Sequence, residues 1–157
     1  MKIFLDTANL DEIRRGAELG VLDGITTNPT LAARENRPFR ELILEACEIL
    51  RGGVVNAEVV STDAEGMLRE GRELASWHPS IVVKVPMLPE GIRAVRLLRD
   101  HGIRTNVTLV FSPAQALLAA KADVNAKDYI GRTALMLASE AGRDEVVRLL
   151  RQAGAKE

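Results

Sequence analysis

The sequence predicts an α/β protein in which five consecutive strand–helix units build one parallel sheet. From residue 1 to about residue 121, short apolar runs rich in Val and Ile alternate with longer segments of helical period. Turn and capping residues separate the two kinds of segment at most boundaries. Such alternation favours parallel strands, because each parallel pair needs a long crossover connection. A partial TIM-type (βα) barrel is the expected architecture.

Five strands are expected, each short and apolar. They span residues 2–6, 24–28, 54–60, 81–86 and 104–111. Most of these runs are bounded by Gly, Pro, Asn, Asp or Ser, which is typical of strands in a folded core.

Helices are expected after each strand. Capping residues or prolines mark their first turns at Asn9, Pro38, Thr62, Pro89 and Ser112. Glu or Gln stands three residues after Asn9, Thr62 and Ser112, which is the spacing of a capping box. An open, doubly wound sheet is the alternative fold. No Gly-x-Gly-x-x-Gly follows the first strand, so a dinucleotide site is unsupported.

The pattern changes after residue 121. Residues 122–157 resemble a single ankyrin repeat, with a turn built on Asp128 and Gly131 and two helices over residues 133–141 and 144–152. One repeat cannot bury its own apolar face, so these helices are expected to pack on the α/β part or on another chain. The predicted domains are therefore residues 1–121 and 122–157.

Composition argues against several classes of function. The formal net charge is -1, from 21 basic and 22 acidic residues, and this balance suggests neither a nucleic-acid partner nor a membrane surface. Asp6 interrupts the N-terminal apolar stretch too early for a signal peptide. The single cysteine, Cys47, lies on the apolar side of a predicted helix and is expected in the core. A cytosolic protein is the expectation.

Lys84 stands alone in the apolar run 81–86. An ammonium group in a buried strand costs several kcal/mol unless it is paired, neutralised or used. Burial favours the neutral amine of a lysine, which is the nucleophile that forms Schiff bases with carbonyl compounds. The structural alternative is a lysine that reaches water at the strand end or pairs with a carboxylate.

A polar side chain lies near the C-terminal end of every predicted strand. The residues that share a face are Thr26 with Asn28, Asn56 with Glu58, Val82 with Lys84 and Asn106 with Thr108, and Asp6 ends the first strand. Buried parallel strands usually consist of Val, Ile and Leu, so polar exceptions on five consecutive strands predict a site. In the structural alternative, Asp6 caps a turn and Glu58 forms a salt bridge with Lys84.

Four motifs, in order, resemble the small transaldolase and fructose-6-phosphate aldolase family. They are Phe4-Leu5-Asp6-Thr7-Ala8, Gly24-Ile25-Thr26-Thr27-Asn28-Pro29-Thr30, Val83-Lys84-Val85-Pro86 and Thr105-Asn106-Val107-Thr108-Leu109-Val110-Phe111-Ser112. The resemblance extends over residues 1–121, which look like the first five βα units of that family. It implies that Lys84 forms a Schiff base with a ketose or dihydroxyacetone unit of a sugar phosphate.

The same resemblance implies the other roles. Asp6 moves the proton of the hydroxyl on the carbon whose C–C bond breaks. Glu58 and Thr108 together hold a catalytic water. Asn28 and Asn106 bind substrate hydroxyls, and Thr26 can hold a hydroxyl or a water. No metal or cofactor is implied, because the iminium is itself the electron sink. Glu58 matches the transaldolase branch, whereas the aldolase branch carries glutamine there.

The chain departs from the family pattern after residue 121. The family closes an eight-stranded barrel, and the last three units are absent here, with their serine and phosphate-binding arginines. Ile130-Gly131-Arg132 is similar to the family's Val-Gly-Arg, so Arg132 is a further substrate-binding candidate. An ankyrin turn expects Gly131 and Arg132 at the same positions, and this is the favoured interpretation.

Five strands cannot close a barrel, so the open face needs a cover. Either the C-terminal helices fold over it or chains associate into a homo-oligomer. Two functional classes follow from this. The first is a Schiff-base transferase or lyase acting on a sugar phosphate, with low or no activity as an isolated monomer. The second is a chimeric scaffold, without activity, in which the ankyrin-like part serves packing or protein contact.

Overall fold

The computed structural model describes residues 2–122, 133–140, 142, 144, 147–148 and 151. Five parallel strands form one sheet in the order β1-β2-β3-β4-β5. The strands are β1 (Phe4–Asp6), β2 (Gly24–Thr26), β3 (Val54–Glu58), β4 (Ile81–Pro86) and β5 (Thr105–Thr108). Each strand pairs with its neighbour in sequence, and β1 and β5 are the two edges of a sheet that does not close. The predicted α/β fold with five parallel units is confirmed.

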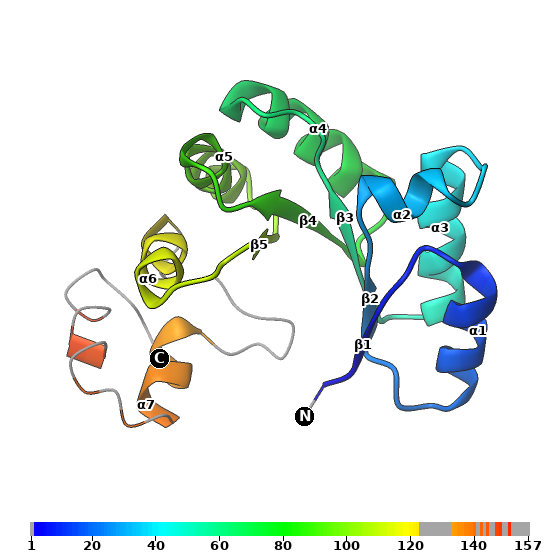
Figure 1. Cartoon of the computed structure of the whole chain (residues 1–157), viewed down its shortest axis with the longest axis horizontal. Coiled ribbons are helices and arrows are strands. Elements are labelled where there is room, and N and C mark those ends of the chain that lie inside the picture. Colours follow the sequence, from blue (N-terminus) through cyan, green and yellow to red (C-terminus); the bar gives the residue numbers. More distant parts are fainter. Residues whose placement is uncertain are drawn as a thin grey trace.

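Helices follow the strands around one side of the sheet, as an arc from α1 to α6 (Figure 1). They are α1 (Leu10–Glu18), α2 (Pro29–Ala33), α3 (Phe39–Leu50), α4 (Ala64–Trp77), α5 (Pro89–Asp100), α6 (Pro113–Ala122) and α7 (Ala134–Glu140). Helix α2 was not expected. The second strand ends at Thr26 rather than residue 28, because Asn28 becomes the N-cap of α2 and its Oδ1 accepts a bond from Leu31 N at 2.9 Å.

The cap of α1 agrees with the expectation at Asn9, whose Oδ1 accepts from Asp11 N and Glu12 N. Glu12 does not return to the Asn9 amide directly, as a capping box requires. Instead, Asn9 N donates to Thr7 Oγ1 at 3.1 Å, and that hydroxyl donates to Glu12 Oε2 at 2.6 Å. The Thr7 hydroxyl therefore relays the expected contact.

The expected cap of α4 is wrong by one residue. Asp63, not Thr62, is the N-cap, and its Oδ1 accepts from Gly66 N at 2.8 Å. A carboxylate at this position also interacts favourably with the positive end of the helix dipole. The expected cap of α6 is correct, because Ser112 Oγ accepts from Gln115 N at 3.2 Å.

The main core lies between the sheet and helices α1 to α5. Alternate strand residues enter it from the outer face of the sheet, and the largest fully buried side chains include Ile13, Ile25, Leu42, Ile43, Val55, Met67, Val83 and Leu98. Cys47 is buried on α3, as expected. Burial raises the pKa of its thiol to about 11, with a further contribution from Glu48. The thiol is therefore protonated and unreactive at neutral pH.

Helix α7 packs apart from the main core. Leu135 and Ala138 are buried against Leu117 and Ala120 of α6 and against Val147. The bounds of α7 agree with the first helix expected over residues 133–141. The expected turn at Asp128 and Gly131 lies outside the described residues, and so does most of the second helix. The ankyrin-like character of residues 122–157 stays a prediction.

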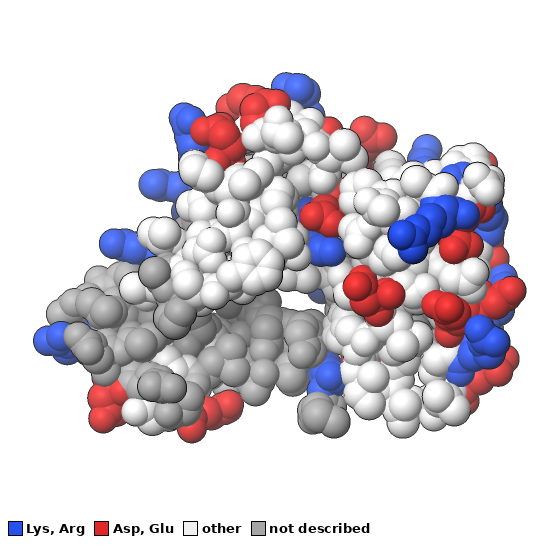
Figure 2. All heavy atoms as spheres, in the orientation of Figure 1, with Lys and Arg blue, Asp and Glu red and all other residues white. Residues whose placement is uncertain are grey.

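Acidic and basic side chains are interspersed over the face drawn in Figure 2, without a patch of one sign. None of the helices in the described part of the chain has the length and apolar character needed to cross a bilayer.

Candidate active site

The strand register places the predicted site residues on one face of the sheet. Asp6, Thr26 and Asn56 are successive Cα partners across β1, β2 and β3. One row further along, Glu58, Lys84 and Asn106 are Cα partners across β3, β4 and β5. Register partners point to the same face, so the expectation from alternation holds across all five strands. This face is opposite to the one that carries Ile25 and Val83 into the core.

Lys84 is the buried cation of this face. The residue is 8% exposed. Its Nζ lies 3.2 Å from Glu58 Oε2, and it donates to the backbone carbonyl of Thr27 at 3.1 Å. Both side chains of the ion pair are largely withdrawn from water, at 10% and 14% exposure. The pair is the salt bridge foreseen in the structural alternative, and it also places a proton acceptor against the amine.

Two amides bridge from β3 to β5 across the strand that carries Lys84. Asn56 is 3% exposed, and its Nδ2 donates to the carbonyl of Ile25 at 3.0 Å. Asn106 Nδ2 donates to Asn56 Oδ1 at 3.1 Å. Because Asn106 is the register partner of Lys84, this amide chain lies beside the lysine on the same face.

Asp6, Thr26 and Thr108 lie on the same face, and among the described residues they form no hydrogen bond or ion pair with Lys84. Asp6 is exposed at the end of β1, whereas Thr26 is half-buried. Thr108 is half-buried at the end of β5, opposite Pro86. The structure therefore aligns these residues along the sheet but does not join them to the lysine.

Asn28, a predicted substrate-binding residue, follows the end of β2 and is the N-cap of α2. Asn28 is half-buried, and its Oδ1 is occupied by the cap of α2, which leaves its Nδ2 for a ligand. Arg132 lies outside the described residues.

Glu70 of α4 holds the loop that follows Glu58. Its carboxylate accepts from Val60 N at 2.6 Å, from Ser61 N at 3.1 Å and from Ser61 Oγ. Partial burial by itself would raise the pKa of the Glu70 carboxyl. The hydrogen bonds donated by Ser61 and Val60, together with the charge of Arg69, outweigh this effect, so the pKa of Glu70 lies below its usual range. Glu70 thus anchors the C-terminal end of β3 as a carboxylate.

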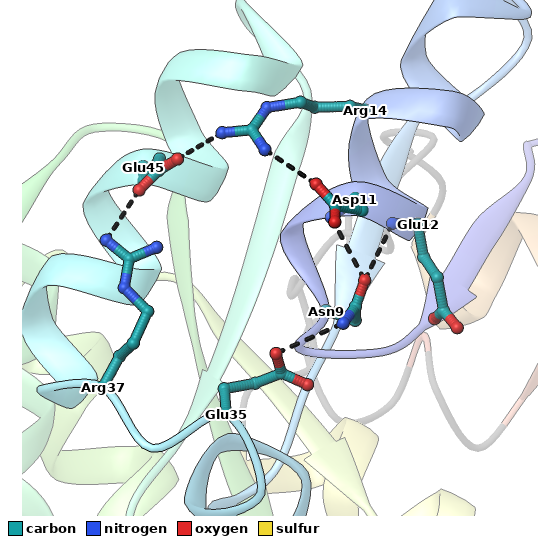
Figure 3. Close-up of polar contacts among 7 residues, drawn as sticks. All are labelled: Asn9, Asp11, Glu12, Arg14, Glu35, Arg37 and Glu45. Atoms are coloured by element: carbon teal, nitrogen blue, oxygen red, sulfur yellow. Dashed lines mark hydrogen bonds and ion pairs between the residues drawn. The ribbon is translucent and has the colours of Figure 1, made fainter.

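A network of charged side chains anchors the start of α1, just after Asp6 (Figure 3). Arg14 pairs with Asp11 at 3.0 Å and with Glu45 of α3, which also pairs with Arg37 at 2.8 Å. From the same helix start, Asn9 Nδ2 donates to Glu35 Oε2 at 3.3 Å. Figure 3 shows these side chains converging from α1, α3 and the loop before α3. The network ties the chain after Asp6 to the α3 side of the fold.

Reasoning from the sequence did not find two parts of this site. The Thr27 carbonyl is a backbone group, and no residue type reveals that it accepts from the lysine. Asn56 was recognised as sharing the face of Glu58, but it received no role. The sequence did contain a signal for Asn56, because it is a polar residue in a strand that is otherwise mostly apolar. In the part of the chain that the structure describes, no group of three or more His, Cys, Asp or Glu side chains is arranged to bind a metal ion.

Comparison with known sequences gives one consistent result. The profile of the transaldolase/fructose-6-phosphate aldolase family matches residues 3–147. The "probable transaldolase" of Desulfotalea psychrophila is 59% identical over 133 residues, which cover 84% of this chain and 62% of that protein. Those of Petrotoga mobilis and Aquifex aeolicus are each 56% identical over 133 residues, or 84% of this chain and 60% and 61% of theirs.

The chain therefore spans about 60% of the length of these curated relatives. The family match extends beyond residue 121 and overlaps most of the segment expected to be ankyrin-like. With a family profile over most of its length and an open, parallel five-stranded sheet, the chain belongs to the transaldolase/fructose-6-phosphate aldolase family.

Proposed function

We propose that the chain carries out Schiff-base chemistry on ketose phosphates, with Lys84 as the nucleophile. The observation that carries this proposal is the burial of Lys84 against Glu58 on the face where the polar residues align. Attack on a carbonyl requires the neutral amine, and Glu58 Oε2 at 3.2 Å is within reach to accept its proton.

The reaction begins when Lys84 Nζ adds to the ketone carbon, and loss of water then gives an iminium. Asp6 takes the proton of the hydroxyl next to the scissile C–C bond. The bond electrons move toward the iminium nitrogen, and an aldehyde leaves. The resulting enamine either adds to another aldehyde, which transfers the dihydroxyacetone unit, or is protonated, which gives aldol cleavage. In both cases water then adds to the iminium carbon, and cleavage of the C–N bond releases the product and the free amine of Lys84. Asp6 is exposed at the end of its strand and so is open to substrate.

The remaining roles follow the family resemblance. Glu58 and Thr108 hold the water that is exchanged at the Schiff base. Thr26, Asn28 and Asn106 bind substrate hydroxyls, and Arg132 is proposed for the phosphate. A sugar phosphate substrate, a homo-oligomer and a cytosolic location all stay predictions.

We expect weak activity from the isolated chain. Strands β1 and β5 have open edges, and the chain spans about 60% of the length of its relatives. A displacement of about 1 Å at a reacting group can cost on the order of a hundredfold in rate. Turnover of fructose 6-phosphate at the level of full-length relatives would contradict this expectation.

The second candidate function is a scaffold without enzymatic activity. The open sheet favours it, because an active barrel site needs walls on all sides. In this proposal the α/β part, residues 1–121, is structural. An ankyrin-like segment at residues 122–157 supplies packing or a protein contact.

Borohydride trapping separates the two functions. The folded chain is incubated with dihydroxyacetone or fructose 6-phosphate, and any Schiff base is reduced with borohydride. Mass spectrometry of the intact protein and of its peptides then detects and locates the adduct. An adduct on the peptide that contains Lys84 is expected, and it should be lost in Lys84→Met, which keeps a long apolar side chain at the buried position. Lys121→Ala is the matched control, because Lys121 is exposed at the end of α6 and should not affect trapping. No adduct from a folded chain would favour the scaffold.

A further inference from the structure

We propose that Asn56 is a positioning residue that fixes the amide of Asn106 so that its Oδ1 faces the substrate and accepts a hydrogen bond from a substrate hydroxyl. The inference rests on the proposed Schiff-base function of Lys84. It gives Asn56 a role, whereas the resemblance to the family gave it none. It also assigns Asn106 a defined direction of hydrogen bonding.

The direction of the amide chain follows from its buried end. The carbonyl of Ile25 can only accept, so the Asn56 side chain must present its NH2 group there, at 3.0 Å. The reverse orientation would bring two oxygens together at a site where Asn56 is 3% exposed. Asn56 Oδ1 must therefore point toward β5.

The orientation of Asn56 dictates that of Asn106. An acceptor at Asn56 Oδ1 requires a donor from Asn106, and Asn106 Nδ2 lies 3.1 Å away. Asn106 Oδ1 then points away from Asn56, and it accepts from no donor among the residues that the structure describes. Since Asn106 is half-buried, this oxygen keeps a directed acceptor position on the face of the sheet.

The register places that acceptor beside the reacting amine. Asn106 is the Cα partner of Lys84, and Asn56 lies in register with Val82, one side-chain step along the same face. The hydroxyls of a carbonyl compound attached to Lys84 Nζ are therefore expected to lie next to Asn106. Glu58 and Thr27 contact the amine from the β2 and β3 side, which leaves the β5 side for these hydroxyls.

The test compares two carbonyl probes on the same lysine. Dihydroxyacetone carries hydroxyls and acetone carries none, so only dihydroxyacetone can use the Asn106 acceptor. In Asn56→Ala, the concentration of dihydroxyacetone that gives half-maximal borohydride trapping should rise roughly tenfold, while that of acetone stays unchanged. Asn106→Ala should give the same change, and the double variant should be no worse than Asn106→Ala alone. Lys121→Ala is the control, because Lys121 is exposed at the end of α6 and should alter neither probe.

Each other outcome is decisive. An equal loss with both probes, or additive losses in the double variant, would mean that Asn56 acts on the fold or on Lys84, and would overturn the inference. Unchanged trapping of dihydroxyacetone would overturn it as well.

A second measurement does not depend on the reaction. The Asn106 side-chain NH2 signals, assigned by their absence in Asn106→Ala, should include one hydrogen-bonded proton that moves upfield in Asn56→Ala. An unmoved signal would show that Asn56 does not hold Asn106. If the parent chain forms no adduct with either probe, the proposed function fails with the substrate part of the inference, while this signal still decides the positioning part.

Discussion

Glu58 and Lys84 meet as register partners on β3 and β4, with Glu58 Oε2 3.2 Å from Lys84 Nζ. Burying two opposite charges in contact has two opposing effects on the stability of the fold. Their attraction is strong where water is excluded, but each charge loses its hydration on folding. The Thr27 carbonyl offsets part of that loss at the amine. Removing one partner should therefore be far more costly than removing both.

A double-mutant cycle tests this relationship. Glu58→Leu and Lys84→Met, made separately, should each lower the free energy of unfolding by about 3 kcal/mol, because each leaves one buried charge unpaired. The combined variant should lie within about 1 kcal/mol of the parent. Urea unfolding at pH 7 measures all four states. Arg93→Ala breaks an exposed pair with Glu90 and serves as the control, and it should leave the free energy of unfolding nearly unchanged. Additive losses in the double variant would show that the two charges are not coupled.

Gly91 supports the end of the lysine strand through close backbone contact. A Cβ at this position would lie 2.0 Å from the carbonyl oxygen of Pro86, the last residue of β4. Neither the strand end nor the start of α5 can yield easily, because the clash is with backbone. Gly91→Ala should therefore cost about 2–3 kcal/mol in urea unfolding and reduce trapping at Lys84.

Gly102 provides the comparison for Gly91. It has φ +70 and open space around it, so Gly102→Ala should cost about 1 kcal/mol, from backbone conformation alone, without affecting trapping. Equal effects of the two substitutions would argue against a specific contact between Gly91 and Pro86.

The alternation of side chains along strands was sufficient to predict the shared face of the site. Glu58, Lys84 and Asn106 were each predicted to point to one side of their own strand, and the register joins those sides into one row. This works because the period of two is a local property of extended backbone. The relation between neighbouring strands then follows from parallel pairing of consecutive units.

What the sequence did not predict depends on contacts between distant elements. Asn28 was expected to extend the second strand, but its side chain caps α2 instead. The choice of Asp63 over Thr62 as a cap depends on how the loop after β3 enters α4. The bond from Lys84 to the Thr27 carbonyl joins residues 57 positions apart, and no periodic pattern carries that information.

Glu70 should make stability depend on pH through the loop that follows Glu58. Hydrogen bonds from Ser61 and Val60 hold its pKa below the usual range in the folded chain, against the opposing effect of burial. A depressed carboxyl pKa contributes stability that is present above the unfolded value, about 4.3, and is lost as the pH falls through the folded value. Glu70→Gln cannot make this contribution. Its deficit in free energy of unfolding should be constant between about pH 7 and pH 5 and should shrink toward pH 3.

Urea titrations of the parent and Glu70→Gln across that range measure the difference directly. Glu73→Gln is the matched control, because Glu73 is exposed on the same helix and its carboxylate holds no loop among the described residues. A deficit that stays constant down to pH 3 would show that the substitution acts through packing rather than through charge. A deficit that shrinks, together with unchanged behaviour of the control, would establish that the carboxylate of Glu70 holds the chain immediately beyond Glu58. Because that segment continues directly from the strand of Glu58, its release at low pH should also loosen the pairing of Glu58 with Lys84.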